Sequence, residues 1–263
     1  TCSMTRPESP QPAGEGLSGA AANTTLNVTL RHSSGAIVTL SSGAAIHPVK
    51  PFEGVRPGGT VYGMCKAISE RVVTSQARTG ISTARYLAVR YGNVLESRGS
   101  IIPLFKHQAD NAEHLTVTDP DMTRFVMTLD DSVDLILRAL KDGESGTTWI
   151  PKLPAMRIGD LAEIFSERSG KPIRVIGLRP GEKKHEDLIN ESESVRTTPF
   201  NQYYIIGPAF EAGTGDRFTY TSADSVMSKG QLRDHLSRLG ILDAPLEQFK
   251  GLAIEEIVTN RKS

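Results

Sequence analysis

A strand–helix–strand pattern runs through residues 36–91, where AIVTLSS (36–42) is followed by VYGMCKAISERVVTSQ (61–76) and TARYLAVRY (83–91). The first segment is a short apolar run typical of a buried strand, and the last is also rich in strand-forming residues. In the middle segment, Met64, Ile68, Val72 and Val73 recur at roughly helical spacing and predict an amphipathic helix over 61–76. A helix between two strands favours a parallel β-α-β unit.

The same alternation continues along the chain. Further strands are predicted at 115–118, 147–151, 173–176 and 203–206, and further helices at 130–141, 158–169, 229–239 and 246–260. The start of the 130–141 helix is the best defined, because Thr128 can cap it and Asp131 stands three residues later. Together these elements predict an α/β fold with a parallel sheet.

Composition excludes several classes of protein. Thirty Lys and Arg balance thirty Asp and Glu, so there is no net basic charge to hold a nucleic-acid backbone or an anionic membrane. Cys2 and Cys65 cannot make a disulfide framework, and the histidines never adopt metal-ligand spacing. No apolar run approaches the ~18 residues of a membrane span, and no signal pattern opens the chain. We expect a cytoplasmic protein without a metal site.

Residues 1–35 differ from the rest of the chain. They are rich in Pro, Gly, Ser, Ala and Thr, which predicts a poorly ordered segment. Residues 14–19 spell G-x-G-x-x-G, but Pro7, Pro10 and Pro12 stand where a buried strand would have to precede this motif. We interpret the match as coincidental. The glycine-rich loop that cradles a dinucleotide is therefore not expected here, and the chain would be N-terminally incomplete.

Tyr62 and Lys66 are the first candidates for chemistry. Four residues apart on a helix, they share one face, where the ammonium can lower the pKa of the phenol and make it a usable acid or base. Such a pair also occurs by chance on helix surfaces. Ser42 adds a hydroxyl at the end of the preceding strand. The three residues together resemble the pattern of extended short-chain dehydrogenases/reductases.

Four ordered blocks sharpen this resemblance: RYGNVLESRGSIIPLF (90–105), LTVTDPDMTRFVMTLDDSVDLILRAL (115–140), IPKLPAMRIGDLAEIF (150–165) and GLRPGEKKHEDLINESES (177–194). They closely resemble the UDP-N-acetylglucosamine 4,6-dehydratase or CapD-like polysaccharide-biosynthesis family. The resemblance implies a partial Rossmann-like, doubly wound parallel sheet with a smaller C-terminal substrate-binding domain. It also implies a UDP-sugar substrate, NAD or NADP as cofactor, and a possible homo-oligomer.

The resemblance also implies a division of the chain and a set of site residues. Residues 1–35 would be a poorly ordered segment, 36–95 a partial NAD(P)-binding region, and 96–263 a nucleotide-sugar region with a helical C-terminal extension. Tyr62, Lys66 and Ser42 would be catalytic, the first two also touching the cofactor.

Substrate contacts are implied for four residues. Asn93 would touch a phosphate or the sugar, Arg124 would pair with the pyrophosphate, and Arg179 with Glu182 would hold the nucleoside end. Taken alone, Arg124 could equally form a rim salt bridge with Asp119 or Asp121.

The chain departs from this family where its first predicted strand ends. Dehydratases of the family carry Thr-Asp-Lys there, whereas this chain has Ser42, Gly43 and Ala44. Gly43 and Ala44 supply neither the acid nor the base that loss of water needs besides the tyrosine. The run SSGAA is more similar to the Ser-Ser-Ala-Ala of nucleotide-sugar 4-epimerases. Three interpretations stay open: a dehydratase-like or epimerase-like enzyme, a noncatalytic protein that binds nucleotide sugars, and an assembly subunit completed by another chain.

Overall fold

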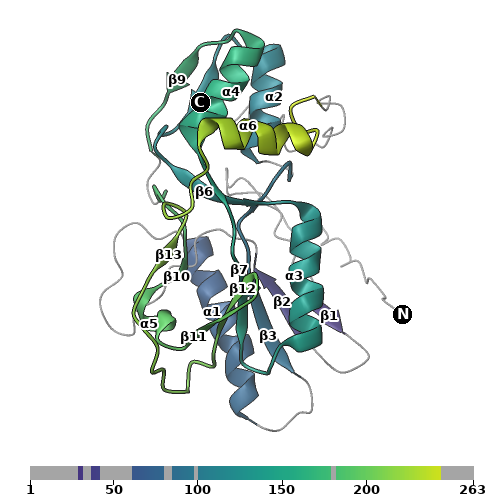
Figure 1. Ribbon diagram of the computed structural model, residues 1–263, viewed down its shortest axis with the longest axis vertical. Helices are drawn as coiled ribbons and strands as arrows, with labels where there is room; N and C mark the ends of the chain where they lie inside the picture. The colour runs from purple at the N-terminus through teal and green to yellow at the C-terminus, as the bar shows by residue number, and fades with distance from the viewer. Residues whose placement is uncertain are drawn as a thin grey trace, which may run out of the picture.

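The computed structural model describes residues 29–31, 37–41, 61–79, 85–97, 100–178 and 182–243. In Figure 1 the lower part of the molecule holds the main sheet with α1 and α3, and the upper part gathers α2, α4 and α6. The helix predicted over 246–260 lies outside the described residues, as do Ser42, Arg179 and nearly all of the segment 1–35.

The main sheet has six strands, in the order β1 (Thr29–Arg31), β2 (Ile37–Ser41), β3 (Tyr86–Arg90), β7 (Thr148–Pro151), β12 (Tyr203–Ile206) and β11 (Thr197–Phe200). The central strands β2, β3 and β7 are parallel. β1 joins antiparallel at one edge, and β12 and β11 join antiparallel at the other. The helix α1 (Val61–Ser75), continued by a 3₁₀ turn (Gln76–Arg78), connects β2 to β3. The predicted α/β fold is confirmed.

Helices cover both faces of this sheet. Leu87 and Val89 of β3 pack with α3 (Leu129–Asp142) on one face. Arg90, the next residue, binds Glu70 of α1 on the other face. Because successive side chains of a strand alternate between faces, α1 and α3 lie on opposite sides of the sheet. This is the doubly wound arrangement that the resemblance implies.

The sheet draws its strands from both sides of residue 95. β2 and β3 precede that position, whereas β7, β11 and β12 follow it. The region predicted to bind the nucleotide sugar therefore also completes the main sheet. The domain boundaries themselves stay a prediction.

The buried face of α1 is polar, which the amphipathic pattern did not predict. Ile68 and Val72 are 59% and 55% exposed, while Lys66 and Glu70 are buried. The helix is turned with its charged side inward because Glu70 meets Arg90 there. A buried charge is tolerated only when it is paired, so this ion pair allows the charged side of the helix to face the sheet.

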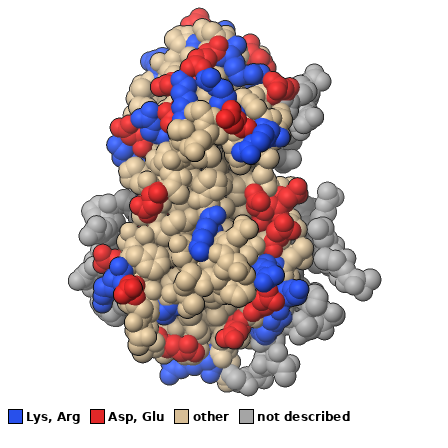
Figure 2. Space-filling model, viewed as in Figure 1, with Lys and Arg blue, Asp and Glu red and all other residues tan. Residues whose placement is uncertain are grey.

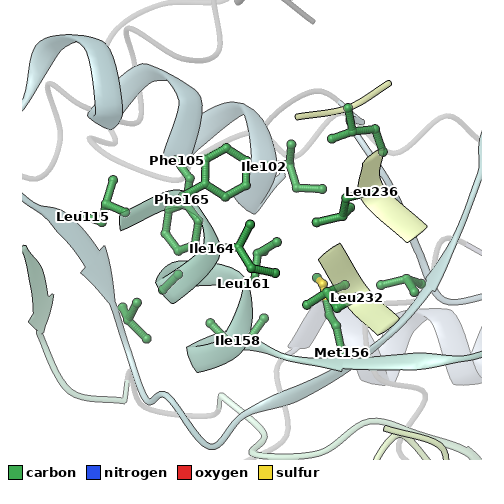
Figure 3. Packing of buried hydrophobic residues seen from close by; sticks show 14 of the residues in the cluster. Ile102, Phe105, Leu115, Met156, Ile158, Leu161, Ile164, Phe165, Leu232 and Leu236 are labelled. Atoms are coloured by element: carbon green, nitrogen blue, oxygen red, sulfur yellow. The ribbon is translucent and has the colours of Figure 1, made fainter. Parts of the chain in front are cut away.

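Three helices form the second core. α2 (Ile101–Asn111), α4 (Ile158–Ser169) and α6 (Lys229–Arg238) bring their apolar side chains together (Figure 3). The rings of Phe105 and Phe165 meet edge to face at 5.8 Å. The sequence analysis did not predict α2. The remaining elements are β4 (Asn93–Val94) with β6 (Thr123–Met127) and β8 (Ala155–Arg157), β5 (Leu115–Val117) with β9 (Ile173–Val175), β10 (Asp187–Ile189) with β13 (Tyr220–Thr221), and the short α5 (Glu191–Ser194).

The predicted cap of α3 is confirmed. The Thr128 side chain accepts a hydrogen bond from the Asp131 amide at 3.1 Å, and the Asp131 carboxylate accepts one from the Thr128 amide at 2.8 Å. This reciprocal capping box satisfies two of the amides that a helix start leaves without partners.

Gly143, which follows α3, is expected to reject a larger side chain. A Cβ atom there would lie 2.4 Å from the Ala139 carbonyl oxygen and 2.8 Å from a Leu87 methyl carbon. We expect Gly143→Ala to lower the free energy of unfolding by about 1–3 kcal/mol, the usual cost of overpacking, in urea denaturation. The control is Gly230→Ala in α6, where a Cβ atom meets nothing within 4 Å. Equal losses for the two variants would contradict the steric explanation.

Candidate active site

Tyr62 and Lys66, two of the predicted catalytic residues, lie on the helix that begins near the carboxyl edge of the main sheet. β2 ends at this edge with Ser41, and β3 ends there with Arg90. Since α1 connects these parallel strands, it begins near the carboxyl edge and returns the chain to the amino end of β3. Tyr62 and Lys66 therefore occupy the first turns of α1 on the side of the carboxyl edge. Ser42 and the side chain of Tyr62 lie outside the described residues, so their contact stays a prediction.

Lys66 is a buried cation in this region, 8% exposed. An ammonium group is rarely buried unless it interacts with other groups of the protein, and Lys66 does make an interaction there. A buried ammonium one helical turn after Tyr62 fits the role of stabilising a phenolate. It also fits contact with a hydroxyl-bearing cofactor, so this part of the structure is compatible with the predicted nicotinamide dinucleotide.

Asn93 and Arg124 lie on neighbouring strands just beyond this edge. β4 follows β3 directly and pairs in parallel with β6, so that Asn93 stands opposite Val126. Arg124 is two residues before Val126 on the same strand. The two predicted substrate residues therefore lie on paired strands, two positions apart along them. Asn93 is exposed.

Arg124 binds the loop 182–187 rather than the acidic residues near it in sequence. Its two Nη atoms donate to the carbonyl oxygens of Lys184 at 3.1 Å and Lys183 at 3.0 Å, and its Nε lies 3.5 Å from a Glu186 oxygen. The rim salt bridge with Asp119 or Asp121 is not formed, because Lys184 takes those carboxylates. Burial lowers the pKa of Arg124, while Glu186 and Glu182 act in the opposite direction.

Further hydrogen bonds fasten the same loop to β6. The Thr123 amide donates to the Lys184 carbonyl oxygen at 3.0 Å. The Thr123 hydroxyl lies 2.8 Å from His185 Nδ1 and 2.6 Å from the Ser222 hydroxyl. The Glu186 amide in turn donates to Ser222 at 2.9 Å. Glu182, a predicted nucleoside contact, therefore begins a loop that is tied to the strand bearing Arg124, and the charges of the two residues interact.

A buried cluster around Arg90 was missed in the sequence. Its guanidinium binds both Glu70 of α1 and Glu193 of α5. The only local signal was an arginine at the end of the otherwise apolar strand YLAVR. Burial alone would raise the pKa of Glu193, but Arg90 holds it below its ordinary value.

Comparison with known proteins identifies the family. The family model described as "Polysaccharide biosynthesis protein" matches residues 20–208. The chain belongs to this family. The predicted resemblance to CapD-like polysaccharide-biosynthesis proteins is thereby confirmed.

Relatives in the family extend beyond this chain. The UDP-glucose 4-epimerase of Rickettsia canadensis is 37% identical over 188 residues, which cover 70% of this chain and 52% of the relative. An uncharacterized membrane protein of Methanocaldococcus jannaschii is 33% identical over 217 residues, covering 78% and 62%. The X-ray structure of Pen from Bacillus thuringiensis matches with a TM-score of 0.70 and 34% identity, covering 79% of this chain and 63% of that one. The chain spans about half the length of the curated epimerases that it matches.

Among the described residues, no group of three or more His, Cys, Asp or Glu side chains could hold a metal ion. In the same part of the chain, every helix is too short or too polar to cross a membrane. On the face shown in Figure 2, Lys and Arg intermingle with Asp and Glu, and the surface between the two parts of the molecule is mostly uncharged.

Proposed function

We propose that this polysaccharide biosynthesis protein modifies the hexose of a UDP-N-acetylhexosamine at its 4-hydroxyl, with NAD or NADP as cofactor. The observation that carries the proposal is the burial of Lys66 in the first turns of α1, near the edge of the sheet beyond which Asn93 lies on β4. β4 pairs with β6, the strand that holds the loop of Glu182. Membership of the family and the curated epimerases among its relatives support it.

In this mechanism the catalytic residues act on one oxygen. Tyr62 takes the proton from the sugar 4-hydroxyl, and the Lys66 ammonium favours the phenolate form of Tyr62. Ser42 donates a hydrogen bond that orients the same oxygen. A nicotinamide, when bound, supplies the hydride acceptor.

The substrate residues hold the nucleotide end. Asn93 would contact a phosphate or the sugar, and Arg179 and Glu182 would hold the nucleoside end. For Arg124, the hydrogen bonds to the Lys183 and Lys184 carbonyl oxygens favour a role in holding the loop over direct pairing with the pyrophosphate.

Epimerisation at C4 is favoured over 4,6-dehydration. Gly43 and Ala44 cannot supply the additional acid and base that dehydration requires. The relatives named UDP-glucose 4-epimerase agree with this choice. Incubation with UDP-N-acetylglucosamine and NAD, followed by NMR of the products, tests it: the C4 epimer is expected, and a 4-keto-6-deoxy sugar would contradict the argument from Gly43 and Ala44.

A noncatalytic nucleotide-sugar binder is the second candidate, favoured by the proline residues before the only G-x-G-x-x-G match. Calorimetry separates the two functions. Binding of both UDP-N-acetylglucosamine and NAD or NADP supports the enzyme, whereas binding of the UDP-sugar alone supports the noncatalytic protein. Light scattering of the same samples tests the predicted homo-oligomer and the completion of the site by another chain.

Loss of Arg124 is expected to weaken nucleotide-sugar binding. Arg124→Gln removes hydrogen bonds to two loop carbonyls and the ion pair with Glu186. Since each charge-assisted hydrogen bond contributes about 1.5–3 kcal/mol, the Kd for UDP-N-acetylglucosamine should rise at least about tenfold in calorimetry. Arg157→Gln is the control, because Arg157 lies on the adjoining strand β8 but its ion pair is with Asp160 and not with the loop. An unchanged Kd in Arg124→Gln would contradict the role of the loop.

A further inference from the structure

Arg90 lies at the centre of a buried charge cluster that the proposed mechanism does not use. Its side chain is 4% exposed, and those of Glu70 and Glu193 are 7% and 3% exposed. Nε and Nη2 donate to the two Glu70 oxygens at 2.8 and 2.6 Å, and Nη2 and Nη1 donate to the Glu193 oxygens at 2.7 and 2.9 Å. Nη1 also donates to the Leu188 carbonyl oxygen at 2.7 Å. An arginine has five N–H donors, and these five acceptors determine its orientation.

The cluster joins elements that are far apart in the chain. Arg90 ends β3, Glu70 lies in α1, and Leu188 and Glu193 belong to β10 and α5. Glu193 is itself held by Asn190, whose amide side chain donates to it at 2.6 Å. Since β10 begins where the loop 182–187 ends, the cluster ties α1 to the segment that follows this loop.

Glu70 lies on the same face of α1 as the predicted catalytic pair. It follows Lys66 by four residues and Tyr62 by eight, so the three positions lie one above another on consecutive turns. Lys66 and Glu70 are both buried, whereas the apolar Ile68 and Val72 point outward. An ion pair, and not an apolar stripe through these two residues, therefore sets the rotation of the helix about its axis.

We propose that Arg90 is a positioning residue: through Glu70 it sets the rotation of α1, and with it the direction in which Tyr62 and Lys66 face a substrate held by the loop 182–187. This inference rests on the proposed function. It predicts that Arg90 acts on turnover more than on substrate binding, because Arg124 and Thr123 hold the loop independently of Arg90.

Arg90→Lys tests the inference, because lysine keeps the charge but cannot bind two carboxylates in the bidentate geometry. The matched control is Arg85→Lys, just before the amino end of the same strand, where Arg85 donates to the Gly143 and Leu140 carbonyl oxygens at 2.7 and 2.6 Å. For each 263-residue variant we would measure Tm, kcat and KM with UDP-N-acetylglucosamine and NAD, and amide hydrogen exchange in residues 61–75. Since small misplacements of catalytic groups are costly, kcat of Arg90→Lys should fall about 10- to 100-fold with KM within about twofold.

Amide exchange gives a readout that needs neither substrate nor cofactor. The two variants are compared at temperatures equally far below their own Tm values. Under these conditions, the amides of α1 should exchange faster in Arg90→Lys than in Arg85→Lys. Equal kcat values and equal α1 exchange in the two variants would overturn the inference, as would a rise in KM without a fall in kcat. If the unmodified chain shows no turnover, the proposed function fails, and exchange alone decides: faster α1 exchange in Arg90→Lys supports the positioning role, and equal exchange overturns it.

Discussion

Arg90→Met is expected to lower the free energy of unfolding at pH 7 by about 3–5 kcal/mol, the usual cost of breaking a buried ion pair. The substitution leaves Glu70 and Glu193 facing each other across the space that the guanidinium occupies. Two buried carboxylates without their shared cation are unfavourable, and Arg71, 3.8 Å from Glu193 and half exposed, compensates only weakly. Urea denaturation of both proteins measures the difference.

In the same variant, the contribution of Glu193 to the free energy of unfolding should change with pH in the opposite direction. In the unmodified chain the pKa of Glu193 is lowered in the folded state: burial opposes this, but Arg90 prevails. Its contribution to stability is therefore present above the unfolded pKa of about 4.3 and is lost as pH falls through the folded value. In Arg90→Met, burial without the cation should raise the pKa of Glu193, so the variant loses stability as pH rises.

A comparison at two pH values decides this point. The free energy of unfolding of Arg90→Met should lie closer to that of the unmodified chain at pH 5 than at pH 7.5. Arg85→Met serves as control, since Arg85 binds two carbonyl oxygens. That control should lose about 1–3 kcal/mol at both pH values. If Arg90→Met loses the same free energy of unfolding at both pH values, the pKa of the carboxylates does not change on folding, and the prediction is wrong.

Tyr62→Phe is expected to lower kcat for UDP-N-acetylglucosamine by about 10²–10⁴-fold, the range that general acid–base catalysis contributes. Phenylalanine keeps the ring and removes only the hydroxyl that takes the proton from the sugar. The Kd for the UDP-sugar should therefore stay within about twofold, because the diphosphate contacts are assigned to other residues. Product NMR gives kcat, and calorimetry gives Kd.

Tyr86→Phe provides the control for Tyr62→Phe. Tyr86 begins β3 at the amino edge of the sheet, away from the edge at which α1 starts. The substitution Tyr86→Phe should therefore leave kcat unchanged. Full turnover in Tyr62→Phe would remove Tyr62 from the mechanism, and an equal fall in both variants would point to a general loss of folded protein.

Local patterns in the sequence predicted most elements of the described fold but missed some. The Thr128 and Asp131 signature predicted the start of α3, since a capping box lies within four consecutive residues. α2 was not predicted. Its Pro103 stands in the first turn, where the missing amide hydrogen of proline costs nothing. Four sequence blocks predicted the family, and the match over residues 20–208 confirmed it.

No such local pattern predicted which side of α1 faces the sheet. The period of Met64, Ile68 and Val72 suggested a buried apolar side, but Ile68 and Val72 are exposed. The helix is oriented instead by Glu70 and Arg90, 20 residues apart, and by Glu193, 103 residues beyond Arg90. Helix period and caps are local properties, so the chain alone specifies them. The pairing of buried charges depends on which distant segments the folded sheet brings together, and only the three-dimensional arrangement reveals that.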